Sequence, residues 1–181
     1  IREAESTINC LTYVYWRGDI AREVAQALAD RAREGVEVNV LLDAIGTVKM
    51  DRDALRTMRD AGVNVAQFRP LKPYAVRRAN NRTHRKLLIA DGKVGLTGGV
   101  GIAEEWTGNA QDPDHWRDTH VRVCGPVVRS LFGAFAENWL EATGEVLAGE
   151  HYLPEIPEQE QGGPMMVVRS SAGVGDSNVE A

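Results

Sequence analysis

The first 68 residues alternate between strand-like and helix-like segments, and no other feature of the chain constrains its fold as strongly. Segments 8–15, 36–42 and 63–68 are rich in β-branched and apolar residues, which predicts three strands. Apolar residues recur at helical spacing over 20–32, and Asp51 can cap a second, shorter helix. This order is typical of parallel strands that are joined by helical crossovers.

The second half of the chain predicts a hairpin, further strands and a long helix. Asp91-Gly92 is a strong hairpin signal between two short apolar runs. A long helix is expected from Gly125-Pro126 to about Gly144. Further strands are expected at 86–90, 94–97, 119–124 and, last, 165–168. We therefore expect an α/β domain with a mixed, mostly parallel sheet flanked by helices.

Charge is distributed unevenly along the chain. The net charge is −5, but residues 69–93 carry eight Lys and Arg against one acid, and residues 141–181 carry eight acids against one Arg. The basic segment includes a Pro- and Arg-rich loop at 69–82, and it is suited to attract an anionic substrate. No apolar run approaches the roughly 18 residues that could cross a bilayer. A membrane anchor, if there is one, is expected to lie outside this chain.

The two cysteines belong to no metal-spacing motif. Cys10 and Cys124 both lie in apolar, strand-like stretches. Buried, reduced thiols in a cytoplasmic compartment are the favoured interpretation, and a disulfide between them stays open.

The residues that point to chemistry are His84-x-Lys86-x4-Asp91, followed by Gly98-Gly99. Side chains at i and i+2 of a strand point to the same face, so His84 and Lys86 are expected to share one space. An imidazole can attack or donate a proton near neutral pH, and an ammonium can hold a phosphate oxygen and stabilise growing negative charge. That combination of groups is suited to a reaction at a phosphodiester that uses no metal ion.

This motif, together with 96–100 (Leu-Thr-Gly-Gly-Val) and 116–123 (Trp-Arg-Asp-Thr-His-Val-Arg-Val), resembles the phospholipase D superfamily, and most closely its bacterial cardiolipin synthase branch. The resemblance runs from about residue 8 to residue 144. It implies a phosphohistidine intermediate that one histidine forms while a second protonates the leaving alcohol. His84 would then be the nucleophile or the general acid.

The resemblance also implies roles for five other residues. Lys86 would bind phosphate, with Gly98 and Gly99 beside it in the substrate site. Asp118 would orient the imidazole, and Asp91, counted with the catalytic motif, would mainly order the turn.

Two departures from the family pattern matter. An Asn that helps to hold phosphate is often found where this chain has Gly101. The enzymes also use two facing motifs, whereas this sequence contains one. We therefore expect a phospholipase D-like domain at 1–144, and at 145–181 an acidic linker that opens an absent second half.

Several other patterns are weaker. Gly99-x-Gly101-x-x-Glu104 lacks the third glycine and the βαβ context of a dinucleotide site. His115, Asp118 and His120 match no standard metal spacing, so surface or structural roles are favoured for the two histidines. Trp106 and Trp116 are expected to be partly buried, although lipid contact stays open. Asp43 follows a predicted parallel strand and is favoured as a loop or capping acid.

The leading hypothesis is a phosphatidyl transferase of cardiolipin synthase type that needs no cofactor or metal and uses a phospholipid resembling phosphatidylglycerol. The second motif would come from the same chain or from a homodimer. The expected location is the cytoplasmic face of the cell membrane, with peripheral membrane contact. Two alternatives remain: a dimeric, metal-independent phosphodiesterase or nuclease of the same superfamily, and a catalytically silent domain that binds anionic lipid.

Overall fold

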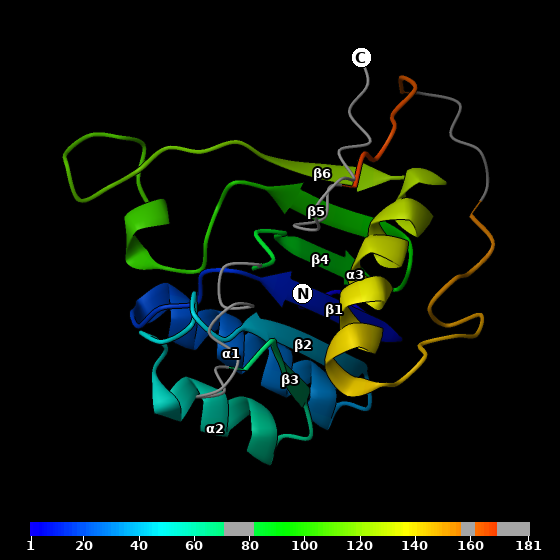
Figure 1. Ribbon diagram of the computed structural model, residues 1–181, viewed down its shortest axis with the longest axis horizontal. Coiled ribbons are helices and arrows are strands. Elements are labelled where there is room, and N and C mark those ends of the chain that lie inside the picture. The colour runs from blue at the N-terminus through cyan, green and yellow to red at the C-terminus, as the bar shows by residue number, and fades with distance from the viewer. Residues whose placement is uncertain (71–81, 157–161, 170–181) are drawn as a thin grey trace.

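A computed structural model describes residues 1–70, 82–156 and 162–169 of the chain. In the described residues, six strands form one sheet with three α-helices and one short 3-10 helix (Figure 1). The strands are β1 (Thr7–Thr12), β2 (Glu37–Asp43), β3 (Asn64–Phe68), β4 (Leu87–Ala90), β5 (Val94–Gly98) and β6 (His120–Cys124). The helices are α1 (Asp19–Arg33), α2 (Arg52–Asp60), α3 (Val127–Thr143) and the 3-10 helix η2 (Glu104–Trp106).

The strand order is β3-β2-β1-β4-β5-β6, so β1 and β4 join two differently paired halves. β1, β2 and β3 pair in parallel, as the strand–helix alternation predicted. β4 pairs antiparallel with β1, and β5 and β6 continue the antiparallel pairing. The expected α/β fold with a mixed sheet and flanking helices is confirmed. The expectation that this sheet is mostly parallel is wrong: among the strands that the structure describes, two pairings, β1–β2 and β2–β3, are parallel, and the other three are antiparallel.

The helices bury apolar side chains on both faces of the sheet. α1 and α2 pack against one face through residues such as Leu28 and Met58, which belong to the same buried cluster as Ile8 of β1. α3 packs against the other face, where Phe135 lies with Leu11 of β1 (Figure 1). Ile8 and Leu11 serve opposite cores because alternate residues of a strand point to opposite faces.

Local signals set the helix ends. The Asp51 carboxylate accepts a hydrogen bond from the Asp53 amide at 3.0 Å and caps α2, as the sequence predicted. α3 ends at Gly144, whose φ of 79° is a left-handed conformation that glycine adopts without a steric penalty. In the part of the chain that the structure describes, no helix combines the length and apolar character needed to span a bilayer.

The carboxyl-terminal segments pack against the domain without extending the sheet. Tyr152 is 3% exposed and stacks on Phe132 of α3, and the Thr7 hydroxyl donates to the His151 carbonyl at 3.3 Å. The strand predicted at 165–168 is wrong: these residues form no strand. Two of these four residues are β-branched valines, which favour an extended backbone, but a strand also needs hydrogen bonds to a neighbouring strand. The boundary predicted at residue 144 stays a prediction.

The cysteines are both free thiols, Cys10 buried and Cys124 exposed. Burial raises the pKa of Cys10 to about 12, so this thiol stays protonated. The prediction of a buried thiol therefore holds for Cys10 and is wrong for Cys124, which lies on the outermost strand.

Candidate active site

The segment that carries the motif enters β4 as an extended chain with two different faces. Thr83 and Arg85 point toward α3, where both side chains contact the Asn138 side-chain oxygen, at 3.5 and 2.9 Å. Side chains alternate along an extended chain, so His84 and Lys86 project from the opposite face. His84 is exposed and Lys86 half-buried, so both groups are open to solvent.

A tyrosine that follows β1 holds the His84 ring. The Tyr13 and His84 rings stack with their centroids 4.1 Å apart and their planes 20° apart. The Lys86 ammonium donates to the His84 carbonyl at 3.3 Å. The stack fixes the plane of the imidazole, and the ammonium lies beside the same backbone.

Lys86, Asp118 and His120 form one electrostatic cluster. Burial lowers the pKa of Lys86 from its ordinary 10.5, and the Asp118 carboxylate acts in the opposite direction. Burial also lowers the pKa of His120 from 6.5; Asp118 opposes this shift, and the Lys86 charge adds to it. The cluster thus contains an ammonium, an imidazole and a carboxylate close enough to affect one another's ionisation.

Gly98 and Gly99 make room for that cluster. A Cβ on Gly99 would lie 2.1 to 2.3 Å from the Asp118 carboxylate atoms, so this carboxylate rests against the Gly99 backbone. A Cβ on Gly98 would lie 2.3 Å from the Thr119 carbonyl oxygen and 3.0 Å from His120 Nδ1. The Asp118 carboxylate also accepts the Thr119 amide at 2.7 Å. The two glycines are therefore required by close packing against 118–120.

A buried ion pair anchors the chain two residues before His84. Arg82 Nε donates to both Asp43 carboxylate oxygens, at 3.1 and 3.0 Å, and the two side chains are 7% and 0% exposed. The other guanidinium nitrogens donate to the Arg69 and Phe68 carbonyls at 2.9 and 3.0 Å. Asp43 also accepts the amides of residues 45 and 46. The start of the motif is thereby tied to the ends of β2 and β3.

Asp91 lies at the other end of β4 from His84 and Lys86. Its carboxylate accepts the backbone amides of Glu5, Ser6 and Thr7 at 2.7 to 3.1 Å. The structure therefore brings His84, Lys86, Gly98, Gly99 and Asp118 together at one end of the β4–β6 sheet. It places Asp91 where it joins the hairpin to the start of β1.

Three features of this region were missed from the sequence. Tyr13 was treated only as part of a strand, and His120 as a surface residue. Asp43 was treated as a loop or capping acid; it does cap the following turn, but it is buried and pairs with Arg82. The spacing of two between Asp118 and His120 is a sequence signal that the two residues lie close together, but only the strand registers place His120 beside Lys86.

The aromatic residues near the site form a chain of ring contacts. Trp106 lies between Trp16 and Trp116, with centroid distances of 5.8 and 4.6 Å. Trp106 is partly buried as expected, whereas Trp116 is 44% exposed. His115 contacts Asp112 at 2.7 Å, away from Asp118. Over the described ranges, no group of three His, Cys, Asp or Glu side chains is arranged to hold a metal ion.

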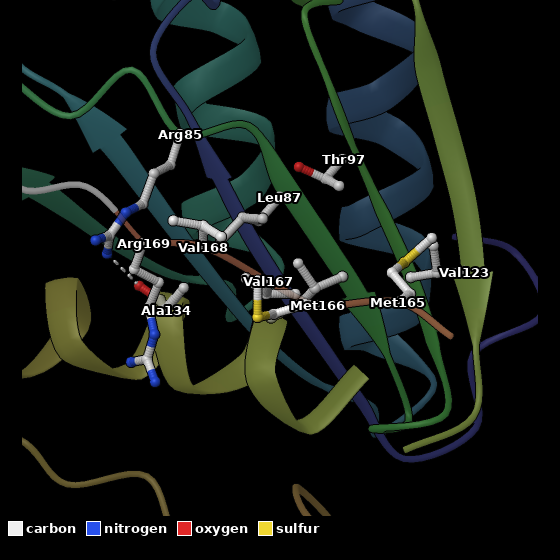
Figure 2. Close-up of a pocket in the computed structure, with 11 residues that line it drawn as sticks. Arg85, Leu87, Thr97, Val123, Ala134, Met165, Met166, Val167, Val168 and Arg169 are labelled. Atoms are coloured by element: carbon white, nitrogen blue, oxygen red, sulfur yellow. Dashed lines mark hydrogen bonds between the residues drawn. The ribbon is translucent and has the colours of Figure 1, made fainter. Parts of the chain in front are cut away.

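A groove of about 290 Å³ lies on the opposite face of the sheet. Its walls include Leu87 of β4, Val123 of β6 and Ala134 of α3. Figure 2 shows residues 165–169 crossing this α3 side of the sheet, with Arg85 at one end. Because His84 and Lys86 project from the other face, this groove is separate from the candidate active site.

The basic loop can be located only in part. Arg69 and Arg82 hold the ends of the loop, and Arg69 contacts Glu141 of α3 at 2.6 Å. Lys72, Arg77 and Arg78 lie outside the described residues.

Solved structures define the class of fold. The chain matches a phospholipase D family member, Nuc from Salmonella typhimurium, with a TM-score of 0.56 and 15% identity, over 78% of this chain and 82% of that one. It matches phosphatidylserine synthase from Haemophilus influenzae with a TM-score of 0.59 and 13% identity, over 87% of this chain and 36% of that one. Because these identities are low, the matches establish the phospholipase D-like fold alone.

The sequence comparisons establish the family. The model of the family described as "Cardiolipin synthase, PLD-like domain" matches residues 1–112, which is more than half of the chain. The chain belongs to this family. It is 34% identical over 172 residues to a cardiolipin synthase of Alkalihalophilus pseudofirmus, and 35% identical over 179 residues to a probable cardiolipin synthase of Bacillus subtilis. These matches cover 94% and 98% of this chain but 34% and 36% of the relatives, so the chain spans about a third of their length.

Proposed function

We propose that this chain supplies one half of the active site of a phosphatidyl transferase, with phosphatidylglycerol or a similar phospholipid as donor. The observation that carries the proposal is the placement of His84 and Lys86 on one open face, beside Asp118. An imidazole that can bond to phosphorus and a cation that can hold its oxygens are the minimal equipment for phosphodiester exchange without a metal.

The reaction would run in two displacements. In the first, an imidazole nitrogen attacks phosphorus, the bond from phosphorus to the leaving glycerol oxygen breaks, and a second histidine gives that oxygen a proton. In the second, the hydroxyl of an acceptor alcohol loses its proton to that second histidine and attacks phosphorus, and the phosphorus–nitrogen bond breaks. The net change moves the phosphatidyl group between alcohols and consumes no proton.

The described residues would fill defined roles in this scheme. His84 would be the nucleophile or the proton donor, with its ring plane set by Tyr13. Lys86 would hold a phosphoryl oxygen, and the Gly98-Gly99 turn would let the substrate approach the backbone. Asp118 would orient the imidazole, as the family resemblance implies, and would also keep Lys86 charged, because its carboxylate raises the pKa that burial lowers. Asp91 would keep the hairpin attached to β1.

The second histidine would come from another copy of the motif. We propose that it lies either in a second half of the natural protein or in a homodimer partner. Relatives about three times as long as this chain favour the first arrangement. Because phosphatidylglycerol is a membrane lipid, the site would work at a bilayer surface, on the cytoplasmic side.

The test is transfer by the full natural protein on vesicles that contain radiolabelled phosphatidylglycerol. We expect labelled cardiolipin and glycerol to form, and His84→Ala to remove that activity while His151→Ala keeps it. His151 is the matched control because it lies against Glu37, at the opposite end of β2 from the site. Metal-independent plasmid cleavage that is lost in His84→Ala, without lipid transfer, would instead favour the dimeric phosphodiesterase. Lipid binding with neither activity would favour a silent domain.

A further inference from the structure

His120 occupies a position beside Lys86 that the roles above leave unused. In the β5–β6 ladder, Gly98 pairs directly with His120. In the β4–β5 ladder, Leu87 pairs with Thr97, and continuing this register by one residue places Lys86 beside Gly98. Residues directly opposite one another in antiparallel strands point to the same face. Lys86, Gly98 and His120 therefore form one row across three strands.

The residue in the middle of that row is a glycine and has no side chain. Lys86 and His120 are separated by two strand spacings, about 10 Å between their backbones. Gly98 lies between them without a side chain; a Cβ there would meet the backbone first, at 2.3 Å from the Thr119 carbonyl oxygen and 2.6 Å from His120 Cα, and then His120 Nδ1 at 3.0 Å. A cation and an imidazole thus flank a bare stretch of backbone. Charge-assisted hydrogen bonds are about 2.7–2.9 Å long. A phosphoryl group between Lys86 and His120 is suited to accept one such bond from each of them, through oxygens on its two sides.

The surroundings of His120 fit a group that contacts substrate. The residue is exposed, and it lies on the sheet face away from α3. Figure 1 shows α1 and α2 behind the β1–β3 half of the sheet, away from β6. The charged groups that act on its ring are Lys86 and Asp118. Arg122, the next residue on the same face, directs its guanidinium to the Cys124 sulfur at 3.3 Å.

We propose that His120 is a further substrate-binding residue that grips, with Lys86, the same phosphoryl group across Gly98. This inference rests on the proposed function, because that function supplies the phosphoryl group. The half-site would then contain two imidazoles of its own chain, His84 for the chemistry and His120 for binding. A bound phosphate anion would stabilise the imidazolium form of His120 and raise its pKa.

The first experiment measures binding of inorganic phosphate to the 181-residue chain by NMR of its four imidazoles, assigned through single His→Gln variants. Phosphate should raise the pKa of His120 and leave that of His151 unchanged, and Lys86→Gln should remove the response. His120→Gln should weaken phosphate binding about 10- to 100-fold, the effect expected for one charge-assisted hydrogen bond. His151→Gln should bind as the wild type does. An unchanged His120 resonance at a phosphate concentration that saturates Lys86-dependent phosphate binding would overturn the inference, as would the absence of any phosphate binding.

The second experiment measures transfer kinetics of the full natural protein. His120→Gln should raise KM for the phospholipid more than it lowers kcat, whereas His84→Ala should remove turnover. Wild-type KM and kcat in His120→Gln, with turnover still dependent on His84, would reject the inference and leave the proposed function standing. No transfer by the wild type, together with phosphate binding that depends on Lys86 and His120, would reject the transfer and retain the anion site.

Discussion

The buried pair between Arg82 and Asp43 gives a prediction whose size follows from its burial. Arg82→Gln would remove the guanidinium from an Asp43 carboxylate that is fully buried, and would also remove one donor each from the Arg69 and Phe68 carbonyls. Breaking a buried pair by removing one partner destabilises a protein by about 3–5 kcal/mol, because a charge is left uncompensated. For a domain of this size, that loss lowers the Tm by roughly 6–20 °C.

The matched control is Arg56→Gln. Arg56 also pairs with an aspartate, Asp53 at 2.8 Å, but the two side chains are 66% and 74% exposed. Exposed pairs contribute about 0–1 kcal/mol. The free energy of unfolding of both variants would be measured by urea titration followed by circular dichroism, and the Tm by thermal scans.

The pairing can be separated from each residue's other contacts with a double variant. Asp43→Asn keeps an oxygen that can accept the amides of residues 45 and 46 but removes the charge. Asp43→Asn combined with Arg82→Gln should therefore lose less stability than the two single losses added together. The reasoning is refuted if Arg82→Gln is within 1 kcal/mol of Arg56→Gln, or if the double loss is simply additive.

Three further predictions concern the site itself. Asp118→Asn removes the charge that raises the pKa of Lys86. When pH is raised, this variant should therefore lose phosphate binding at a lower pH than the wild type does. Loss of binding at the same pH in both proteins would contradict this. Tyr13→Ala should lower kcat for lipid transfer clearly more than Tyr13→Phe, because Phe keeps a ring to stack on His84; equal kinetics would rule out a positioning role. Gly99→Ala puts a Cβ within 2.1–2.3 Å of the Asp118 carboxylate atoms, so it should reproduce the pH shift of Asp118→Asn, and wild-type binding at high pH would show that this packing is unimportant.

Much of the fold was predictable because its signals are local. The helix cap at Asp51, the hairpin at Asp91-Gly92 and the end of α3 at Gly144 each depend on a few adjacent residues. The parallel pairing of β1 to β3 and the β4–β5 hairpin followed from the spacing between strands, whereas the antiparallel pairing of β4 with β1 and of β6 with β5 did not. What the spacing could not give is the strand order, in which β4 pairs with β1 and separates the two halves.

The site was predictable only as far as its motif extends. His84 and Lys86 share a face because side chains two positions apart on an extended chain point the same way. Asp43 and Arg82 are 39 residues apart, and both residue types are common, so no sequence pattern distinguished this buried pair from surface charges. The position of His120 depends on the registers of two ladders, which only the assembled sheet defines.

The central claim is that an imidazole of this site bonds covalently to the phosphorus of a phospholipid. The most direct measurement is the mass of the full natural protein after acid quenching during turnover with phosphatidylglycerol. We predict a phosphatidyl adduct on a histidine in the wild type and in His151→Gln, and no adduct in His84→Asn. This result is expected whether His84 attacks phosphorus or donates the proton. Turnover at the wild-type rate in a folded His84→Asn variant, or turnover in the wild type with no adduct at any quench time, would contradict the account.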